Sequence, residues 1–115
     1  MVTGYGEAET ESNETLQRYA ALKMFDVMRK PSLHEALIKI GSYVLSEFGY
    51  LIANEPGKGF VTQFNMIKQK LPDCSPSAKA ILLTAFLKMT KNSPEVIPLA
   101  KEVFLAHQAH WNVEI

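Results

Sequence analysis

The stretch SLHEALIKIGSYVLSEFGYLIAN, at residues 32–54, decides the fold class of this chain. Ser32 and Glu35 have the spacing of a capping box, which opens a helix. On a helical wheel, the only wide polar strip consists of Glu35, Lys39, Ser42 and Ser46. The rest of the circumference is apolar, and such a helix must be covered by neighbouring elements on several sides. The stretch therefore predicts a long, largely buried helix over residues 32–54.

Four further helices are predicted around this stretch by apolar residues that recur at helical spacing. Serine followed by proline, at residues 75–76 and 93–94, supplies an N-cap and a first-turn proline. Pro98 lacks an N–H, so the last helix is either kinked there or begins nearby. Alternation with period two is never sustained, which argues against strands. The four predicted helices cover residues 13–30, 60–72, 75–92 and 94 onward.

The order of these helices predicts an all-α chain, an α-solenoid of HEAT or armadillo type with about five antiparallel helices. Short loops make successive helices antiparallel, and the helix pairs recur about every 35–45 residues, the period of such solenoids. Residues 1–12 are acidic and contain glycine, so we expect a flexible lead-in to a solenoid over 13–115. Residues 112–115 resemble the first turn of another helix. We therefore expect a fragment truncated at its C-terminal end, whose uncovered apolar surface favours self-association.

Composition excludes several classes of function. The 115 residues suffice for one domain, and 12 Lys and Arg balance 12 Asp and Glu. A nucleic-acid binder or a polycationic membrane binder would carry an excess of positive charge, so neither is expected. Cys74 has no second cysteine with which to form a disulfide or a zinc site. Since no segment has the pattern of a signal peptide or a membrane span, we expect a reduced, soluble, intracellular protein.

No group of residues has the pattern of a catalytic, cofactor or metal site, so none is predicted and no enzyme activity is expected. Cys74 is predicted to lie in a turn without a basic neighbour that would activate its thiol. His107 and His110 are one helical turn apart, but no third metal ligand joins them at helical spacing. His34 stands at a helix start, where an exposed polar role suffices. Lys58 lies between two glycines, yet a phosphate-binding P-loop needs a different spacing and a preceding strand.

Glu47 is the least expected residue, because a carboxylate on an apolar helix face is costly unless it is paired or hydrogen-bonded. It is either a recognition or catalytic acid, or a structural group bonded to backbone or a hydroxyl that locks adjacent helices. No His, Ser or second acid stands in a matching place, which favours the structural role. Gly41 and Gly49 in the same helix indicate close approach of another backbone. Phosphorylation of the serines at 75 and 93 is an alternative to capping, but capping explains both positions.

Several stretches carry a resemblance to a known family. They are residues 41–53 (GSYVLSEFGYLIA), 55–57 (EPG) and 62–65 (TQFN), extended by matching residues at 16–21, 80–84 and 94–96. Over residues 15–115 the chain resembles the trunk of the alpha-adaptin family, large subunits of the clathrin-associated adaptor complex of the plasma membrane. Pro98 and the acidic lead-in depart from the family's pattern.

The resemblance implies a structural scaffold in the C-terminal half of the trunk, acting through protein contacts in clathrin-mediated endocytosis and vesicular transport. Its implied partners are the beta-type large subunit and the medium and small subunits, with the clathrin coat and membrane reached only indirectly. The implied location is cytoplasmic, on the cytosolic face of the plasma membrane in coated pits. None of the family's lipid- or cargo-binding residues falls within this chain, so the resemblance implies no ligand site. The alternative is a HEAT-repeat scaffold of another adaptor, coat or transport-receptor complex.

Overall fold

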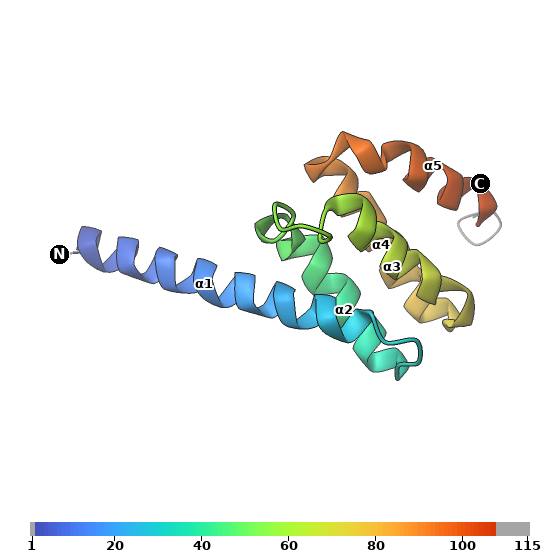
Figure 1. Ribbon diagram of the computed structural model, residues 1–115, viewed down its shortest axis with the longest axis horizontal. Coiled ribbons are helices and arrows are strands. Elements are labelled where there is room, and N and C mark those ends of the chain that lie inside the picture. The colour runs from blue at the N-terminus through green and yellow to red at the C-terminus, as the bar shows by residue number, and fades with distance from the viewer. Residues whose placement is uncertain (1, 108–115) are drawn as a thin grey trace.

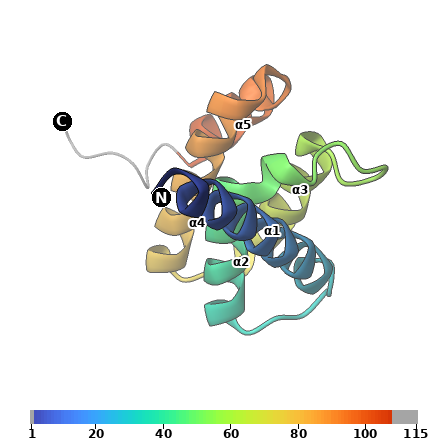
Figure 2. The same ribbon diagram turned by 90° about the vertical axis from the view of Figure 1, so that its left-hand side faces the viewer.

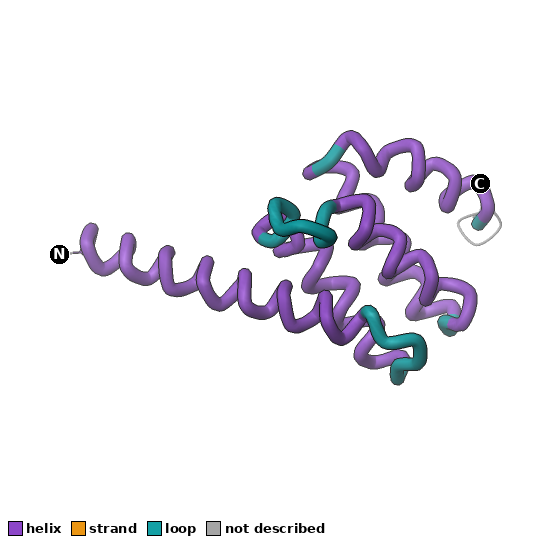
Figure 3. The backbone as a smooth tube through the Cα atoms, viewed as in Figure 1, coloured by secondary structure: helices purple, strands orange, loops and turns teal. Residues whose placement is uncertain are grey.

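The computed structural model of the chain describes residues 2–107 and consists of helices joined by short turns (Figure 1). No strand occurs among these residues, as the tube view makes plain (Figure 3). The predicted all-α solenoid segment is confirmed. The α-helices are α1 (Val2–Met28), α2 (Glu35–Phe48), α3 (Phe60–Lys70), α4 (Pro76–Asn92) and α5 (Ile97–Ala106). Three short 3-10 turns follow α2, α3 and α4: η1 (Gly49–Leu51), η2 (Leu71–Asp73) and η3 (Pro94–Val96).

Helices α2 and α4 run side by side in the same direction, and two contacts fix their register. At their starts, the Glu35 carboxylate accepts hydrogen bonds from the Ser75 N–H at 2.5 Å and from the Ser75 hydroxyl at 3.1 Å. Near their ends, Lys88 forms an ion pair with Glu47. The partners are separated by 40 residues in the first contact and by 41 in the second. The period predicted from the sequence is thus present as physical contacts between equivalent helices.

Helix α1 is held to the rest of the molecule by polar contacts at two places. Near its end, the Lys70 ammonium donates a hydrogen bond of 2.5 Å to the Lys30 carbonyl, again across 40 residues. Further back along α1, Arg18 forms an ion pair with Glu55 of the turn between α2 and α3. The first half of α1 projects beyond the other helices (Figure 1), and Figure 2 views the molecule from the end toward which α1 projects.

All five α-helices contribute to the core, and two aromatic rings pack α3 against α4 within it. The rings of Phe64 and Phe86 have no exposed area, and their centroids are 4.3 Å apart. Phe64 recurs with Phe60, Ile67 and Leu71 at helical spacing, and it lies on the buried side of α3. The other large hydrophobic side chains with no exposed area are Ile52, Ile67, Leu82, Leu83 and Val96.

The structure corrects the predicted start of each of the first two helices. Helix α1 begins at Val2 instead of near residue 13, so the backbone of the expected lead-in is helical from Val2. Helix α2 begins at Glu35, and its N-cap is His34, whose Nδ1 accepts a hydrogen bond of 3.0 Å from the Ala36 N–H. The predicted capping box of Ser32 and Glu35 is wrong, because the Glu35 carboxylate is instead bonded to the start of α4.

The long central helix is shorter than predicted, since α2 ends at Phe48 and continues only as a 3-10 turn. Its two glycines are explained by side chains, not by the close backbone that the sequence suggested. A Cβ at Gly49 would lie 2.0 Å from the Gln63 Oε1, and a Cβ at Gly41 would lie 2.7 Å from the Met28 Sδ. Both positions therefore accommodate a large side chain from a neighbouring helix.

The last helix resolves the alternatives left open at Pro98. Helix α5 begins at Ile97 with Pro98 in its first turn, so the proline marks a helix start and not a kink. Residues 108–115, which include His110 and the predicted further helix at 112–115, lie outside the described residues. Of the helices that the structure describes, none is both long enough and apolar enough to cross a lipid bilayer.

Candidate functional site

Cys74 lies in an environment that does not favour nucleophilic chemistry. Its side chain is buried, and its thiol donates a hydrogen bond of 3.2 Å to the Lys70 carbonyl. Burial raises the pKa of this thiol, and the negative charges of Glu35 and Asp73 raise it further. Because the thiolate is the reactive form of cysteine, these surroundings keep Cys74 in its unreactive protonated form.

The histidines that the structure describes have local structural roles. The Nδ1 of His34 caps α2, and the Nδ1 of His107 lies 3.0 Å from the Val103 carbonyl in its own helix. His110, the other half of the predicted pair, is outside the described residues. Among the described side chains, no three from His, Cys, Asp and Glu converge on a position that could hold a metal ion.

The glycine-flanked Lys58 lies in a turn and not in a phosphate-binding loop. Gly57 has a φ of 76°, a left-handed conformation that glycine adopts without strain. The Lys58 ammonium lies 5.2 Å from the centre of the Phe25 ring, a cation–π distance. This lysine therefore helps to hold the α2–α3 turn against α1.

Glu47 links two helices, which agrees with the structural interpretation of this residue. Its carboxylate pairs with the Lys88 ammonium, and the two side chains are 32% and 37% exposed. The partner is an ammonium group and not the backbone or hydroxyl that the sequence suggested. Because water still reaches both groups, the ion pair costs little desolvation and sets the register of α2 and α4.

Sequence reasoning missed Gln63, a buried amide that ties α3 to two preceding turns. Gln63 has no exposed area, and its Nε2 donates hydrogen bonds to the Gly49 carbonyl at 3.0 Å and the Lys58 carbonyl at 2.8 Å. The sequence signal that could have revealed it is its position three residues after Phe60, on the helix face that also carries Phe64 and Ile67. A buried polar group is expected to be hydrogen-bonded, and these two bonds meet that requirement for the amide nitrogen.

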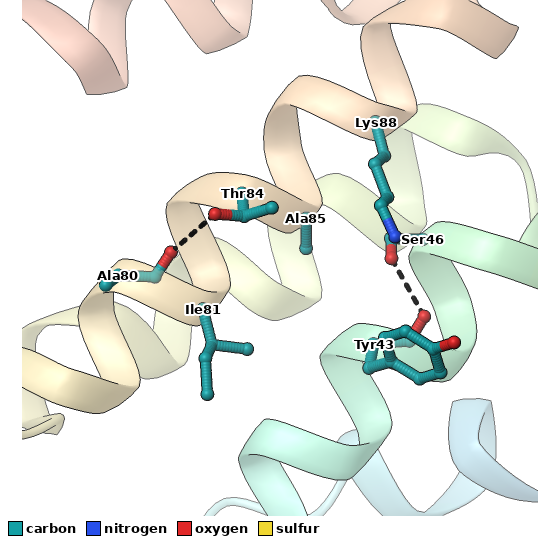
Figure 4. A pocket seen from close by; sticks show the side chains of 7 residues that line it. All are labelled: Tyr43, Ser46, Ala80, Ile81, Thr84, Ala85 and Lys88. Carbon is teal, nitrogen blue, oxygen red and sulfur yellow. Dashed lines mark hydrogen bonds between the residues drawn. The ribbon is translucent and has the colours of Figure 1, made fainter.

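A groove lies between α2 and α4. Its volume is about 280 Å³, and Figure 4 shows its lining side chains. We call it the α2–α4 groove; it is lined by Tyr43, Ser46, Ala80, Ile81, Thr84, Ala85 and Lys88. The hydroxyls of Ser46 and Thr84 are already used, because Ser46 donates to the Tyr43 carbonyl at 2.8 Å and Thr84 to the Ala80 carbonyl at 3.0 Å. The groove is therefore apolar in effect.

Two of the exposed large hydrophobic side chains, Tyr43 and Ile81, line this groove and are 53% and 38% exposed. The other large exposed hydrophobic side chains on α2, η1 and α4 are Leu37, Ile40, Tyr50 and Leu87.

The fold defines the class: an all-α solenoid segment. No family model matches the chain. It is 38% identical over 104 residues to AP-2 complex subunit alpha-2 of Dictyostelium discoideum and, again over 104 residues, 38% identical to AP-2 complex subunit alpha of Schizosaccharomyces pombe. It is 34% identical over 108 residues to AP-2 complex subunit alpha-2 of Arabidopsis thaliana.

Each of these matches covers 90% of this chain but only 10% to 12% of the relative. The chain thus spans about a tenth of the length of the relatives. The resemblance to alpha-adaptins is confirmed, and the chain matches one segment of them.

Proposed function

We propose that this chain is a scaffold segment of the alpha-type large subunit of a clathrin adaptor complex. It acts in clathrin-mediated endocytosis and vesicular transport by protein–protein contact and without catalysis. The observation that carries the proposal is the 38% identity, over 90% of the chain, to AP-2 alpha subunits of two organisms. In this proposal its partners are the beta-type, medium and small subunits, and it lies at the cytosolic face of the plasma membrane.

The physical basis of a scaffold role is rigidity between successive repeats. Glu35 with Ser75 and Glu47 with Lys88 hold α2 and α4 at both ends. The apolar core fills the space between these ties and the neighbouring helices. In a solenoid each repeat contacts mainly its neighbours, so well-fixed neighbours give a surface of defined curvature. Such a surface holds partners at fixed relative positions.

A segment exchange tests the proposal. The part of the D. discoideum alpha-2 subunit that aligns with this chain is replaced by this chain, and the chimera is co-expressed with that organism's beta-type, medium and small subunits. We expect the chimera to co-purify with the other subunits in amounts close to those of the unmodified subunit. A chimera that is soluble and helical but fails to co-purify would overturn the proposal.

A matched pair of variants controls for folding of the exchanged segment. Phe64→Ala, which removes a fully buried ring, should abolish co-purification of the chimera. Val61→Ala, on the same helix but 39% exposed, should leave it intact. If both variants assemble equally well, the exchanged segment contributes nothing to assembly.

A further inference from the structure

A second groove lies between α5 and the end of α3. Its volume is about 290 Å³, and we call it the α3–α5 groove; it is lined by Lys68, Leu71, Pro72, Glu102, Val103, Ala106 and His107. Leu71 and Val103 belong to the buried core, whereas Pro72 and Ala106 are exposed beside them. These four side chains carry no polar atom. The groove therefore favours an apolar group that removes its walls from water.

Polar side chains of the α3–α5 groove come from its other three residues. Lys68 and Glu102 carry opposite charges, and neither forms an ion pair with a side chain that the structure describes. The Nδ1 of His107 lies 3.0 Å from the Val103 carbonyl and is already engaged. A carboxylate accepts hydrogen bonds, and an ammonium is attracted to the face of an aromatic ring. An indole suits this groove, because it joins a broad apolar ring to one N–H donor.

The chain carries its single tryptophan close to this groove in sequence. Helix α5 ends at Ala106, and the residue that closes it, His107, lines the groove. Trp111 follows four residues later, outside the described residues. At about 3.3–3.6 Å per residue, the Cα atoms of His107 and Trp111 are at most about 14 Å apart, whatever path the chain takes. The indole is therefore within reach of the groove.

We propose that the α3–α5 groove is the docking site of the chain's own segment 108–115, and that the Trp111 indole fills it. The ring covers Leu71 and Val103, and its N–H donates to the Glu102 carboxylate. A docked tryptophan removes on the order of 150–250 Å² of its own surface from water. The proposal rests on the chemistry of the groove and on the length of chain that leads from it, and it does not depend on the adaptor assignment.

Covalent attachment favours this occupant over a separate molecule. A short tether gives an effective concentration on the order of millimolar, with which a free ligand or a second copy of the chain would have to compete. Within the segment, Val113 and Ile115 are also apolar, but neither side chain has a donor for the carboxylate at the groove. Trp111 is the residue whose chemistry matches both the apolar walls and the polar side chains.

Tryptophan fluorescence tests the proposal directly, because Trp111 is the only tryptophan in the chain. We expect the emission maximum of the folded chain to lie at shorter wavelength than that of the chain in urea. Acrylamide should quench the folded chain several-fold less efficiently than the unfolded chain. Nuclear Overhauser contacts should join the indole ring to the methyl groups of Leu71 and Val103. None of these signals should depend on protein concentration.

Two substitutions at adjacent residues form a matched pair. Ala106→Glu places a charge in the groove and should move the emission maximum and the acrylamide quenching of Trp111 most of the way to their values in urea. Leu105→Glu adds the same charge at a residue that is 70% exposed and does not line the groove, and it should leave both signals unchanged. Both variants should retain the helical circular-dichroism spectrum of the parent chain.

Trp111→Ala locates the contact from the other side. Its backbone amide shifts should differ from those of the parent chain at Leu71, Val103 and Ala106, and should be unchanged in the α2–α4 groove. Emission from the folded chain equal to that in urea would overturn the proposal, as would equal effects of the two glutamate substitutions. A short-wavelength emission that Ala106→Glu leaves unchanged would place the indole elsewhere. A short-wavelength emission that is lost on dilution would assign the groove to a second copy, and the proposal would again be wrong.

Discussion

At the scale of single residues, Phe64 couples α3 to the centre of the core. Its fully buried ring packs on Phe86 at 4.3 Å. Phe64→Ala should lower the free energy of unfolding by about 3–5 kcal/mol, from lost burial and the cavity left behind. Val61→Ala on the same helix should cost less than about 1 kcal/mol. Urea unfolding followed by circular dichroism measures both, and similar losses in the two variants would contradict the packing described for α3.

Gly49 and Gln63 form a second pair of residues whose contact makes a testable contribution to stability. The backbone at Gly49 is ordinary right-handed helical, with φ of −62°, so an alanine there is not strained by conformation. Its Cβ would however displace the Gln63 side chain, which is bonded to two carbonyls. We expect Gly49→Ala to cost about 1–3 kcal/mol in unfolding free energy through those lost bonds.

A double-mutant cycle checks this cause. In a Gln63→Ala background, Gly49→Ala should cost less than about 0.5 kcal/mol, because the displaced group is no longer present. Additive costs would show that Gln63 is not the contact that requires glycine. Met28 of α1 and Gly41 of α2, which it contacts, provide an independent comparison pair.

These two residues show what a sequence reveals at this scale. Because apolar periodicity reports directly on burial, the burial of Phe64 was predictable from its helical spacing with Phe60, Ile67 and Leu71. Gln63 was not, since its hydrogen-bond partners at Gly49 and Lys58 come from other turns of the chain. A buried amide depends on tertiary partners that no local pattern contains.

At the scale of helices, the contact between the starts of α2 and α4 predicts a pH dependence. Hydrogen bonds from the Ser75 N–H and hydroxyl lower the pKa of Glu35, with smaller contributions from Lys39 and His34. A lowered folded-state pKa means that the charged carboxylate stabilises the fold. This contribution is complete above the unfolded pKa of about 4.3 and is lost as pH falls through the folded value.

Glu35→Gln should therefore reduce stability at neutral pH and flatten the stability profile below about pH 4.3. Melting temperatures measured from neutral to strongly acidic pH would show this. Glu95→Gln, at an exposed position, is the matched control and should leave the shape of the profile unchanged. If the fall of the melting temperature at acidic pH were the same in Glu35→Gln as in the parent chain, the contact with Ser75 would contribute nothing to the pH dependence.

The contact between Glu35 and Ser75 also explains why the first and last residues of helices were harder to predict than the presence of the helices. Ser32 and Glu35 have the spacing of a capping box, but Ser75 competes successfully for the carboxylate across 40 residues. At the other end of α2, Gly49 closes the helix against α3. Helix α1 extends back through Gly4 and Gly6 because the Glu and Ala residues that follow are good helix formers. Local signals therefore located each helix, and tertiary contacts set where α2 begins.

At the scale of the whole molecule, the α2–α4 groove arises from residues about 40 positions apart. Tyr43 and Ile81 become neighbours only when the parallel register of the two helices is fixed. The sequence predicted the solenoid period and the long apolar helix, but not which apolar residues stay exposed. Exposure depends on which side of α2 is covered by α1 and which side is covered by α4. The sequence alone does not reveal how these two helices are arranged around α2.

The distribution of lysines over the molecule predicts weak binding to phosphoinositide membranes. The described lysines are spread over all five α-helices and the turns at residues 30 and 58, and several are already engaged. Lys70 is buried against the Lys30 carbonyl, Lys88 pairs with Glu47, and Lys58 lies over an aromatic ring. A selective headgroup site needs a dense cluster of free cations, whereas scattered lysines give only a diffuse attraction worth about 1 kcal/mol each near an anionic surface.

Vesicles containing phosphatidylinositol bisphosphate should therefore bind the chain no better than phosphatidylserine vesicles of equal total charge. Any binding should be lost at physiological salt, where the Debye length is about 8 Å and isolated surface charges are screened. Co-sedimentation over a range of salt concentrations measures both effects. Lys39→Gln and Lys101→Gln, on different helices, should each lower the residual low-salt binding by similar small amounts. Micromolar binding that discriminates between the two lipids and survives physiological salt would show that these lysines converge on one headgroup, which their spacing over the helices argues against.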